Sequence, residues 1–227
     1  MKKYRNLLFD LDDTLLDFQA AEKQALVKLF ESENIPFSPT IKNLYKEINE
    51  KLWHKFEREE ISREQVIETR FTKLFEVLGK KADGALLDKK YREYIAESTV
   101  FIEGAAELIS TLKDQYALYI VTNGISETQY KRLQRTGLGN QFQNVFVSED
   151  TGYQKPMIQY FEYVFQRIPD FKKEQTLIIG DSFSADIVGG YGAGIDTCWL
   201  NSNNKTNSTS IQPTYEIRSL SQLYSIL

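Results

Sequence analysis

The chain has 227 residues, enough for one large domain or for one domain that carries an inserted second. Its hydrophobic content of 41% is ordinary for a globular protein. Its formal net charge of −4 gives no broad attraction to phosphate backbones or anionic lipid, so we expect neither a nucleic acid polymer nor a membrane as a partner. No apolar run reaches the ~18 residues of a membrane helix, and the run behind Lys2 and Lys3 is too short for a signal peptide, so we expect a cytoplasmic protein.

The first predicted strand is followed by a block of helices. Residues 5 to 10 form a short, continuous apolar run with no helical period, which is typical of a buried strand. Beyond it, apolar side chains recur at helical spacing in four segments, residues 18 to 33, 38 to 56, 62 to 78 and 87 to 95. The block contains no strand pattern, so we expect it to pack as a small helical bundle.

From about residue 104 the pattern changes to helices and strands in alternation. The strands are fully apolar, which indicates a parallel sheet covered by helices on both faces. Strands are expected at residues 117 to 122, 145 to 148, 176 to 180 and 197 to 200. Helices are expected at residues 104 to 113, 126 to 136, 157 to 168, 184 to 192 and 219 to 227, with an exposed loop at 201 to 210.

The strand at residues 5 to 10 is too short to stand alone, so we expect it to join the later sheet. The helical block is then an insertion after the first strand. The predicted fold class is α/β, with a Rossmann-like parallel sheet as the core domain and an inserted α-helical cap domain. We place the core domain at residues 1–16 and 99–227 and the cap domain at residues 17–98.

Polar side chains stand where the apolar runs of three predicted strands stop. In open parallel sheets, ligands bind beyond the carboxyl ends of the strands, where the loops converge. The sequence therefore predicts one site at this edge of the sheet. Its candidate residues are Asp10, Asp12, Thr122, Asn123, Lys155, Asp181 and Asp186.

Several carboxylates at one site repel one another unless a cation neutralises them. The chain has a single cysteine, Cys198, and a single histidine, His54, too few soft ligands for a zinc site. Any metal must therefore be held by oxygen, and a few carboxylates with room for water and phosphate suit Mg²⁺. We expect Mg²⁺ as the cofactor.

Four short motifs in this order resemble those of the haloacid dehalogenase superfamily of hydrolases. They are DLDDT at residues 10 to 14, TN at 122 to 123, KP at 155 to 156 and GDSFSAD at 180 to 186. The helical insertion resembles the family's C1-type cap. Phrases such as DGALL, SEDTG, DTCW and PTYEIR are similar to the YjjG/YfnB group, phosphatases described as nucleotidases of pyrimidine and noncanonical nucleoside monophosphates.

This resemblance implies a role for each motif residue. Asp10 would be the nucleophile that forms an aspartyl-phosphate, and Asp12 the general acid and base. The side chains of Asp10 and Asp181, with the backbone carbonyl of Asp12, would bind Mg²⁺. Lys155, the hydroxyl of Thr122 and the backbone N–H of Asn123 would hold the phosphate. Asp186 would orient metal-bound waters or Lys155.

Other residues in and near the motifs have structural interpretations. Asp17 stands where the N-cap of the first inserted helix is expected, and Asp13 fits turn chemistry, so neither is assigned to the site. Thr14 could fix the turn or take part in the site. In the cap, Trp53 and Phe56 could stack on a base but fit a core stripe better, and Arg70 could reach a substrate or face solvent.

The function expected from these features is Mg²⁺-dependent hydrolysis of a small phosphate ester, and the resemblance implies a nucleoside 5′-monophosphate as the substrate. A sugar phosphate or phosphoglycolate is the alternative substrate, and transfer of the phosphoryl group to a second metabolite stays open. A 2-haloacid dehalogenase would need neither the metal nor Asp12, and a receiver-like signalling module would lack a cap. We expect a monomer or a weak homodimer.

Overall fold

The computed structural model of the chain describes residues 3 to 207 and 209 to 227. Residues 1 and 2, which belong to the predicted core domain, and residue 208, in the predicted loop, lie outside the described residues. The chain divides into two compact units, one formed by Met1–Asp17 and Thr99–Leu227 and the other by Phe18–Ser98. No described helix combines the length and the apolar character that crossing a membrane requires.

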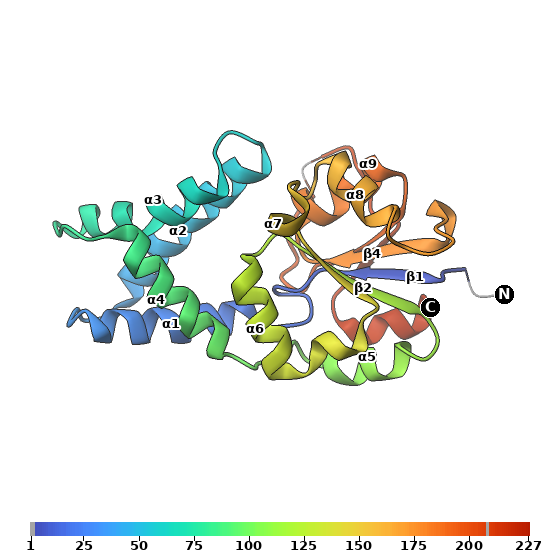
Figure 1. Cartoon of the computed structure of the whole chain (residues 1–227), viewed down its shortest axis with the longest axis horizontal. Coiled ribbons are helices and arrows are strands. Elements are labelled where there is room, and N and C mark those ends of the chain that lie inside the picture. Colours follow the sequence, from blue (N-terminus) through green and yellow to red (C-terminus); the bar gives the residue numbers. More distant parts are fainter. Residues whose placement is uncertain (1–2, 208) are drawn as a thin grey trace. The chain divides into compact units, whose positions relative to one another are not determined.

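A parallel sheet forms the centre of the first unit (Figure 1). The described residues contain six strands, and every neighbouring pair is parallel. In spatial order they are β3 (Asn144–Val147), β2 (Ala117–Thr122), β1 (Asn6–Phe9), β4 (Thr176–Gly180), β5 (Asp196–Leu200) and β6 (Tyr215–Ile217). The predicted α/β class with a Rossmann-like parallel sheet is confirmed.

Helices surround the sheet in this unit (Figure 1). The α-helices are α5 (Ala105–Leu112), α6 (Ser126–Thr136), α7 (Ser148–Thr151), α8 (Ile158–Phe165) and α9 (Val188–Ala193). Short helical turns are η1 (Leu138–Gln141), η2 (Lys173–Gln175), η3 (Phe183–Ile187) and η4 (Leu220–Ser225), of which η3 is π-helical and the others are 3-10.

The central strand β1 is apolar throughout because its side chains alternate between two cores. Leu7 and Phe9 belong to the core on one side of the sheet, together with Leu108 of α5. Leu8 belongs to the core on the other side, together with Phe161 of α8. The strand is therefore buried on both faces, which fixes where its carboxyl end lies.

The short elements α7, η1 and η2 are not predicted from the sequence, and three further elements differ from the prediction. Strand β6 was not predicted, because it has only three residues and Glu216 in its middle is exposed. The helix predicted at residues 219 to 227 is the shorter 3-10 turn η4. The helix predicted at residues 184 to 192 begins earlier, as the π-helical turn η3, and continues as α9.

The chain leaves the first unit and returns to it along two paired segments. Leu16 forms an antiparallel bridge with Phe101, and the backbone N–H of Asp17 donates to the carbonyl of Val100 at 3.0 Å. The N–H of Ile102 donates in turn to the carbonyl of Leu15, also at 3.0 Å. The insertion therefore begins and ends at neighbouring positions.

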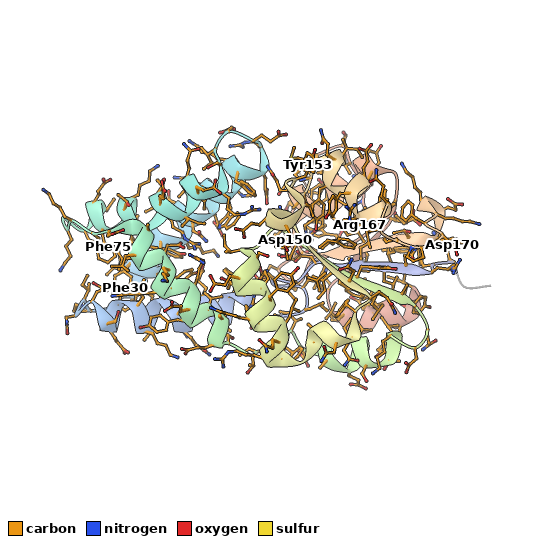
Figure 2. All side chains as sticks on the ribbon, viewed as in Figure 1. Phe30, Phe75, Asp150, Tyr153, Arg167 and Asp170 are labelled. Carbon is orange, nitrogen blue, oxygen red and sulfur yellow. The ribbon has the colours of Figure 1, made fainter. Side chains whose placement is uncertain are left out.

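The second unit is built from four helices in its described residues. They are α1 (Phe18–Ser32), α2 (Pro39–Glu57), α3 (Arg63–Val77) and α4 (Gly84–Glu97). A capping box formed by Ser62 and Gln65 begins α3. Phe30 and Phe75, labelled in Figure 2, meet in the core of this unit with ring centroids 5.8 Å apart.

A buried ion pair lies inside this helical unit. Arg70 of α3 is 3% exposed and pairs with Asp88 of α4, which is fully buried, at 2.5 Å. Arg70 also donates to the side chain of Asn49 at 3.1 Å, and Arg92 pairs with the second oxygen of Asp88 at 2.6 Å. Arg70 thus joins three helices from the inside, and the expectation that it faces a substrate or solvent is wrong.

The aromatic pair considered for base stacking also lies in this unit. Trp53 and Phe56 of α2 are in edge-to-face contact, with ring centroids 5.6 Å apart. Phe56 is buried in a small apolar cluster with Leu52 and Val66, and Trp53 is half-buried against that cluster. Both rings therefore contribute to packing, as the core-stripe interpretation predicted.

We predict that Asp88→Ala destabilises the helical unit by about 3–5 kcal/mol, because it leaves the guanidinium of Arg70 buried without its carboxylate. Denaturant unfolding followed by far-UV circular dichroism measures this change. Glu97→Ala, which removes the exposed ion pair with Lys28, is the matched control and should change little. A loss of less than about 1 kcal/mol for Asp88→Ala would contradict the prediction.

Candidate active site

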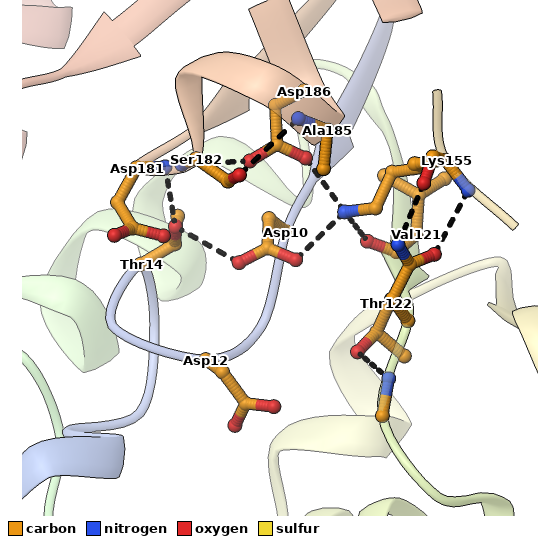
Figure 3. Close-up of polar contacts among 12 residues, drawn as sticks. Asp10, Asp12, Thr14, Val121, Thr122, Lys155, Asp181, Ser182, Ala185 and Asp186 are labelled. Carbon is orange, nitrogen blue, oxygen red and sulfur yellow. Dashed lines mark hydrogen bonds and ion pairs between the residues drawn. The ribbon is translucent and has the colours of Figure 1, made fainter. Parts of the chain in front are cut away.

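Three neighbouring strands deliver their polar residues to one edge of the sheet. Strand β1 lies between β2 and β4, and all three run in the same direction. Asp10 follows β1, Thr122 ends β2 and Asp181 follows β4, so these residues come together as the sequence predicted. Figure 3 shows the resulting group of side chains, with Asp10 at its centre.

An acidic cluster occupies the middle of this site. Oxygen atoms of Asp10, Asp181 and Asp186 all lie within 4.8 Å of one another. Burial raises the pKa of Asp10 well above its usual value, while Lys155 opposes that change. Burial and the nearby charge of Asp186 raise the pKa of Asp181 to about 7. A divalent cation would relieve this repulsion, and a donor set made only of oxygen fits Mg²⁺.

The ammonium group of Lys155 lies inside this cluster. Its Nζ atom donates to Asp10 at 2.8 Å, to Asp186 at 2.6 Å and to the backbone carbonyl of Val121 at 2.8 Å (Figure 3). The side chain is 1% exposed. Burial alone would lower the pKa of Lys155, but the two carboxylates raise it, so the lysine stays charged. All three hydrogens of the ammonium group have an acceptor.

Asp186 is held in place by its own turn. One oxygen pairs with Lys155, and the other accepts the backbone N–H of Ser182 at 3.1 Å. The resemblance implied that Asp186 orients either metal-bound waters or Lys155, and the structure shows a contact with Lys155. A Cβ atom on Gly180 would come within 2.1 Å of the Asp186 carboxylate. The glycine at the end of β4 therefore allows the carboxylate to approach the strand.

Thr14 forms hydrogen bonds with two residues of the acidic cluster. Its hydroxyl donates to Asp10 at 3.1 Å and accepts the backbone N–H of Asp181 at 3.2 Å. Asp13, one residue earlier, has a positive φ of 57°, which an aspartate in a tight turn tolerates. Thr14 therefore holds the turn and touches the site, and Asp13 shapes the turn.

Two motif residues at the end of β2 make different contacts: Asn123 binds the backbone of Lys155, and Thr122 contacts a helix. The side chain of Asn123 accepts the backbone N–H of Lys155 at 2.9 Å and donates to its carbonyl at 2.8 Å. The hydroxyl of Thr122 accepts hydrogen bonds from Gly124 N at 3.2 Å and from Gln129 of α6 at 2.9 Å. Asn123 thus fixes the backbone that carries the buried lysine.

Two residues of α6 that the sequence analysis missed contact the site. Gln129 donates to Asp12 at 2.7 Å, and Arg132 forms an ion pair with the other oxygen of the same carboxylate. Both α6 side chains are buried. The available signal was weak: two polar residues three positions apart share one face of a helix that is polar overall, a pattern that usually indicates solvent exposure.

Comparisons with known proteins find similarity along the whole chain. The family model described as haloacid dehalogenase-like hydrolase matches residues 7–200. Pyrimidine 5′-nucleotidase PynA of Streptococcus pneumoniae is 43% identical, over 99% of this chain and 95% of that protein. Pyrimidine 5′-nucleotidase YjjG of Escherichia coli is 30% identical, over 99% and 98%. The crystal structure of the HAD-hydrolase YfnB of Bacillus subtilis bound to magnesium matches with a TM-score of 0.96 at 57% identity, covering 100% of this chain and 99% of that one.

In the absence of divalent cations, we expect the folding stability of the wild-type protein to fall as the pH rises through the pKa of Asp181. We predict that Asp181→Asn abolishes this fall. The folded carboxyl keeps its proton to about pH 7, whereas its ordinary pKa is 3.8, so the folded protein binds more protons between these values. Stability from this group is thus lost as the pH rises from about 4 to about 7. Denaturant unfolding across this pH range measures the free energy of unfolding of both proteins. Relative to the wild type, that of the variant should increase as the pH rises. A constant difference would contradict the prediction.

Proposed function

The chain belongs to the haloacid dehalogenase-like hydrolase family, and we propose that it removes the phosphate of pyrimidine or noncanonical nucleoside 5′-monophosphates through an aspartyl-phosphate on Asp10. Membership confirms the predicted family and the predicted class of enzyme, a phosphoric monoester hydrolase. The observation that carries the proposal is the buried Asp10 carboxylate, which lies between Lys155 and Thr14 at the end of β1.

The proposed reaction has two halves. First, an oxygen of Asp10 attacks phosphorus, and the bond from phosphorus to the ester oxygen breaks. The electron pair stays on the ester oxygen, which takes a proton from Asp12. Water then attacks the phosphorus of the aspartyl-phosphate, Asp12 takes a proton from that water, and the Asp10 carboxylate is released as inorganic phosphate forms. The cycle consumes one water and restores both carboxyl groups.

Two observed contacts support the proposed phosphate-binding residues. Lys155 presents a buried positive charge next to Asp10, where negative charge gathers on the phosphoryl oxygens. The hydroxyl of Thr122 stands at the end of the neighbouring strand and can donate to one of those oxygens. In the proposal, the backbone N–H of Asn123 donates to another, while its side chain holds Lys155 in position.

The proposed metal ligands are the carboxylates of Asp10 and Asp181 and the backbone carbonyl of Asp12, and a bound Mg²⁺ would supply positive charge beside the reacting phosphoryl group. The donor set supports this assignment because the clustered carboxylates offer only oxygen. Asp186 belongs to the same cluster, and its two oxygens accept from Lys155 and from the backbone N–H of Ser182 in the turn that carries it. We therefore keep Asp186 as a residue that positions Lys155.

The proposed substrate class follows from the relatives. PynA and YjjG carry the name pyrimidine 5′-nucleotidase, and both align along nearly the whole of this chain. A sugar phosphate or phosphoglycolate remains the alternative, since the core motifs recognise only the phosphate. Dehalogenation is disfavoured, because it would use neither Asp12 as an acid nor Asp181 as a metal ligand.

We further propose that the helical unit acts as a cap, with hinges near residues 14 to 18 and 97 to 103. The structure of YfnB is described as revealing an interdomain movement, which is the kind of motion such gating needs. The enzyme would work in the cytoplasm, as a monomer or a weak homodimer.

We predict that Asp10→Asn lowers kcat for a nucleoside monophosphate at least about 10³-fold with little change in fold, because only the nucleophile is lost. Asp13→Asn is the matched control, since it makes the same substitution in the same turn at a residue outside the proposed machinery. Steady-state kinetics measure both variants. A retained rate above about a tenth of wild type in Asp10→Asn would rule out the nucleophile assignment.

We predict that the purified protein with Mg²⁺ releases phosphate from pyrimidine and noncanonical nucleoside 5′-monophosphates faster than from sugar phosphates or phosphoglycolate. Release should stop when the ion is chelated and return when Mg²⁺ is restored, because the acidic cluster then repels the phosphate. A phosphate-release screen with and without a chelator tests both points. Equal rates across all substrates would reduce the assignment to a general phosphatase.

A further inference from the structure

Two buried polar side chains of α6 form a network with the proposed catalytic turn. Gln129 and Arg132 lie one helical turn apart and are 2% and 1% exposed. Most buried polar groups have hydrogen-bond partners, and the side-chain nitrogen of Gln129 and the Nη1 atom of Arg132 both contact Asp12. Arg132 also donates to the side-chain oxygen of Gln129 at 3.0 Å. The three residues therefore form one connected unit.

The chemistry of these groups fixes the direction of every hydrogen bond in the network. A guanidinium can only donate, and of the two atoms of an amide group only the oxygen can accept from it. The amide oxygen of Gln129 must therefore face Arg132, and its nitrogen must face Asp12. The two hydrogens on that nitrogen go to Asp12 at 2.7 Å and to the hydroxyl of Thr122 at 2.9 Å. Gln129 thus links the proposed acid to the proposed phosphate site.

This arrangement determines what the hydroxyl of Thr122 can do. Its oxygen accepts hydrogen bonds from Gln129 and from the backbone N–H of Gly124 at 3.2 Å. A hydroxyl has two acceptor lone pairs and one hydrogen, so both lone pairs are in use. The hydrogen is then directed to a further acceptor, and a phosphoryl oxygen in the proposed site is one.

The same network sets the orientation of Asp12. One oxygen of its carboxylate pairs with Arg132, and the other accepts from Gln129. Figure 3 shows this carboxylate turned away from that of Asp10. In a displacement at phosphorus, the leaving oxygen lies roughly in line with the attacking oxygen and on the opposite side. An acid that protonates the leaving oxygen must therefore stand on the side away from the nucleophile.

We propose that Gln129 and Arg132 are positioning residues that hold Asp12 on the leaving-group side of the site and direct the Thr122 hydroxyl toward the phosphate. This inference rests on the proposed function, because it assigns these residues to the acid of that reaction. Neither side chain touches the reacting atoms. They act through Asp12 and Thr122.

The test compares two substrates with different leaving groups. A nucleoside alkoxide needs a proton as it leaves, whereas the nitrophenolate of p-nitrophenyl phosphate leaves without one. In Arg132→Met, kcat/KM for uridine 5′-monophosphate should fall at least about 10-fold more than kcat/KM for p-nitrophenyl phosphate. Arg132→Lys, which keeps a positive donor, should recover part of this difference. Arg135→Met, an exposed arginine of the same helix, is the control and should change neither value.

A second variant disturbs the network without removing any of its members. A Cβ atom on Gly124 would lie 2.3 Å from the side-chain nitrogen of Gln129, which its hydrogen bonds hold in place. Gly124→Ala should therefore move Gln129 and reproduce the selective loss with uridine 5′-monophosphate. This variant keeps the test valid if Arg132→Met fails to fold, which circular dichroism would reveal.

The outcomes separate this inference from the proposed function. The inference is supported if the wild-type enzyme hydrolyses both substrates and the variants lose more kcat/KM on uridine 5′-monophosphate than on p-nitrophenyl phosphate. Equal losses on both substrates in Gly124→Ala and the Arg132 variants would overturn it and leave the proposed function intact. A wild-type protein that hydrolyses neither substrate with Mg²⁺ would overturn the proposed function and the inference together.

Discussion

The contact of Lys155 with two buried carboxylates is the interaction on which the rest of the site depends. Asp10 comes from the end of β1, Asp186 from the turn η3, and the Val121 carbonyl from β2, and all three accept from one ammonium group. Without that charge, two carboxylates would be buried together at a high cost in desolvation and repulsion. When all three clustered acids are ionised, one ammonium group leaves a negative excess, which a divalent cation would offset.

Two uncharged residues, Asn123 and Gly180, determine where the charged groups of this contact lie. The side chain of Asn123 holds both backbone polar groups of Lys155, so the lysine enters the site at a fixed point. Gly180 leaves the space that the Asp186 carboxylate occupies. Neither residue carries charge, yet each determines where a charge can lie. The geometry of the proposed chemistry is therefore set by backbone positions as much as by the acids themselves.

Much of the sheet and of the acidic site could be predicted from the sequence, because both depend on local patterns. An apolar run such as Leu7 to Phe9 indicates a buried strand, and the carboxyl ends of neighbouring parallel strands must meet, which brought Asp10, Thr122 and Asp181 together. Strand β6 has too few apolar residues for such a pattern. The burial of Gln129 and Arg132 depends on a turn more than a hundred residues earlier in the chain, which the period of one helix does not reveal.

The paired segments around Leu16 and Phe101 have a consequence for how this kind of enzyme can diversify. The insertion starts and finishes at adjoining backbone positions, and hydrogen bonds on the sheet side close that junction. The helical segment has its own apolar core and its own internal ion pair, so its residues can change without altering the strands that carry the acids. The helical unit and the strands that carry the acids can thus change as separate modules, joined at one pair of neighbouring backbone segments.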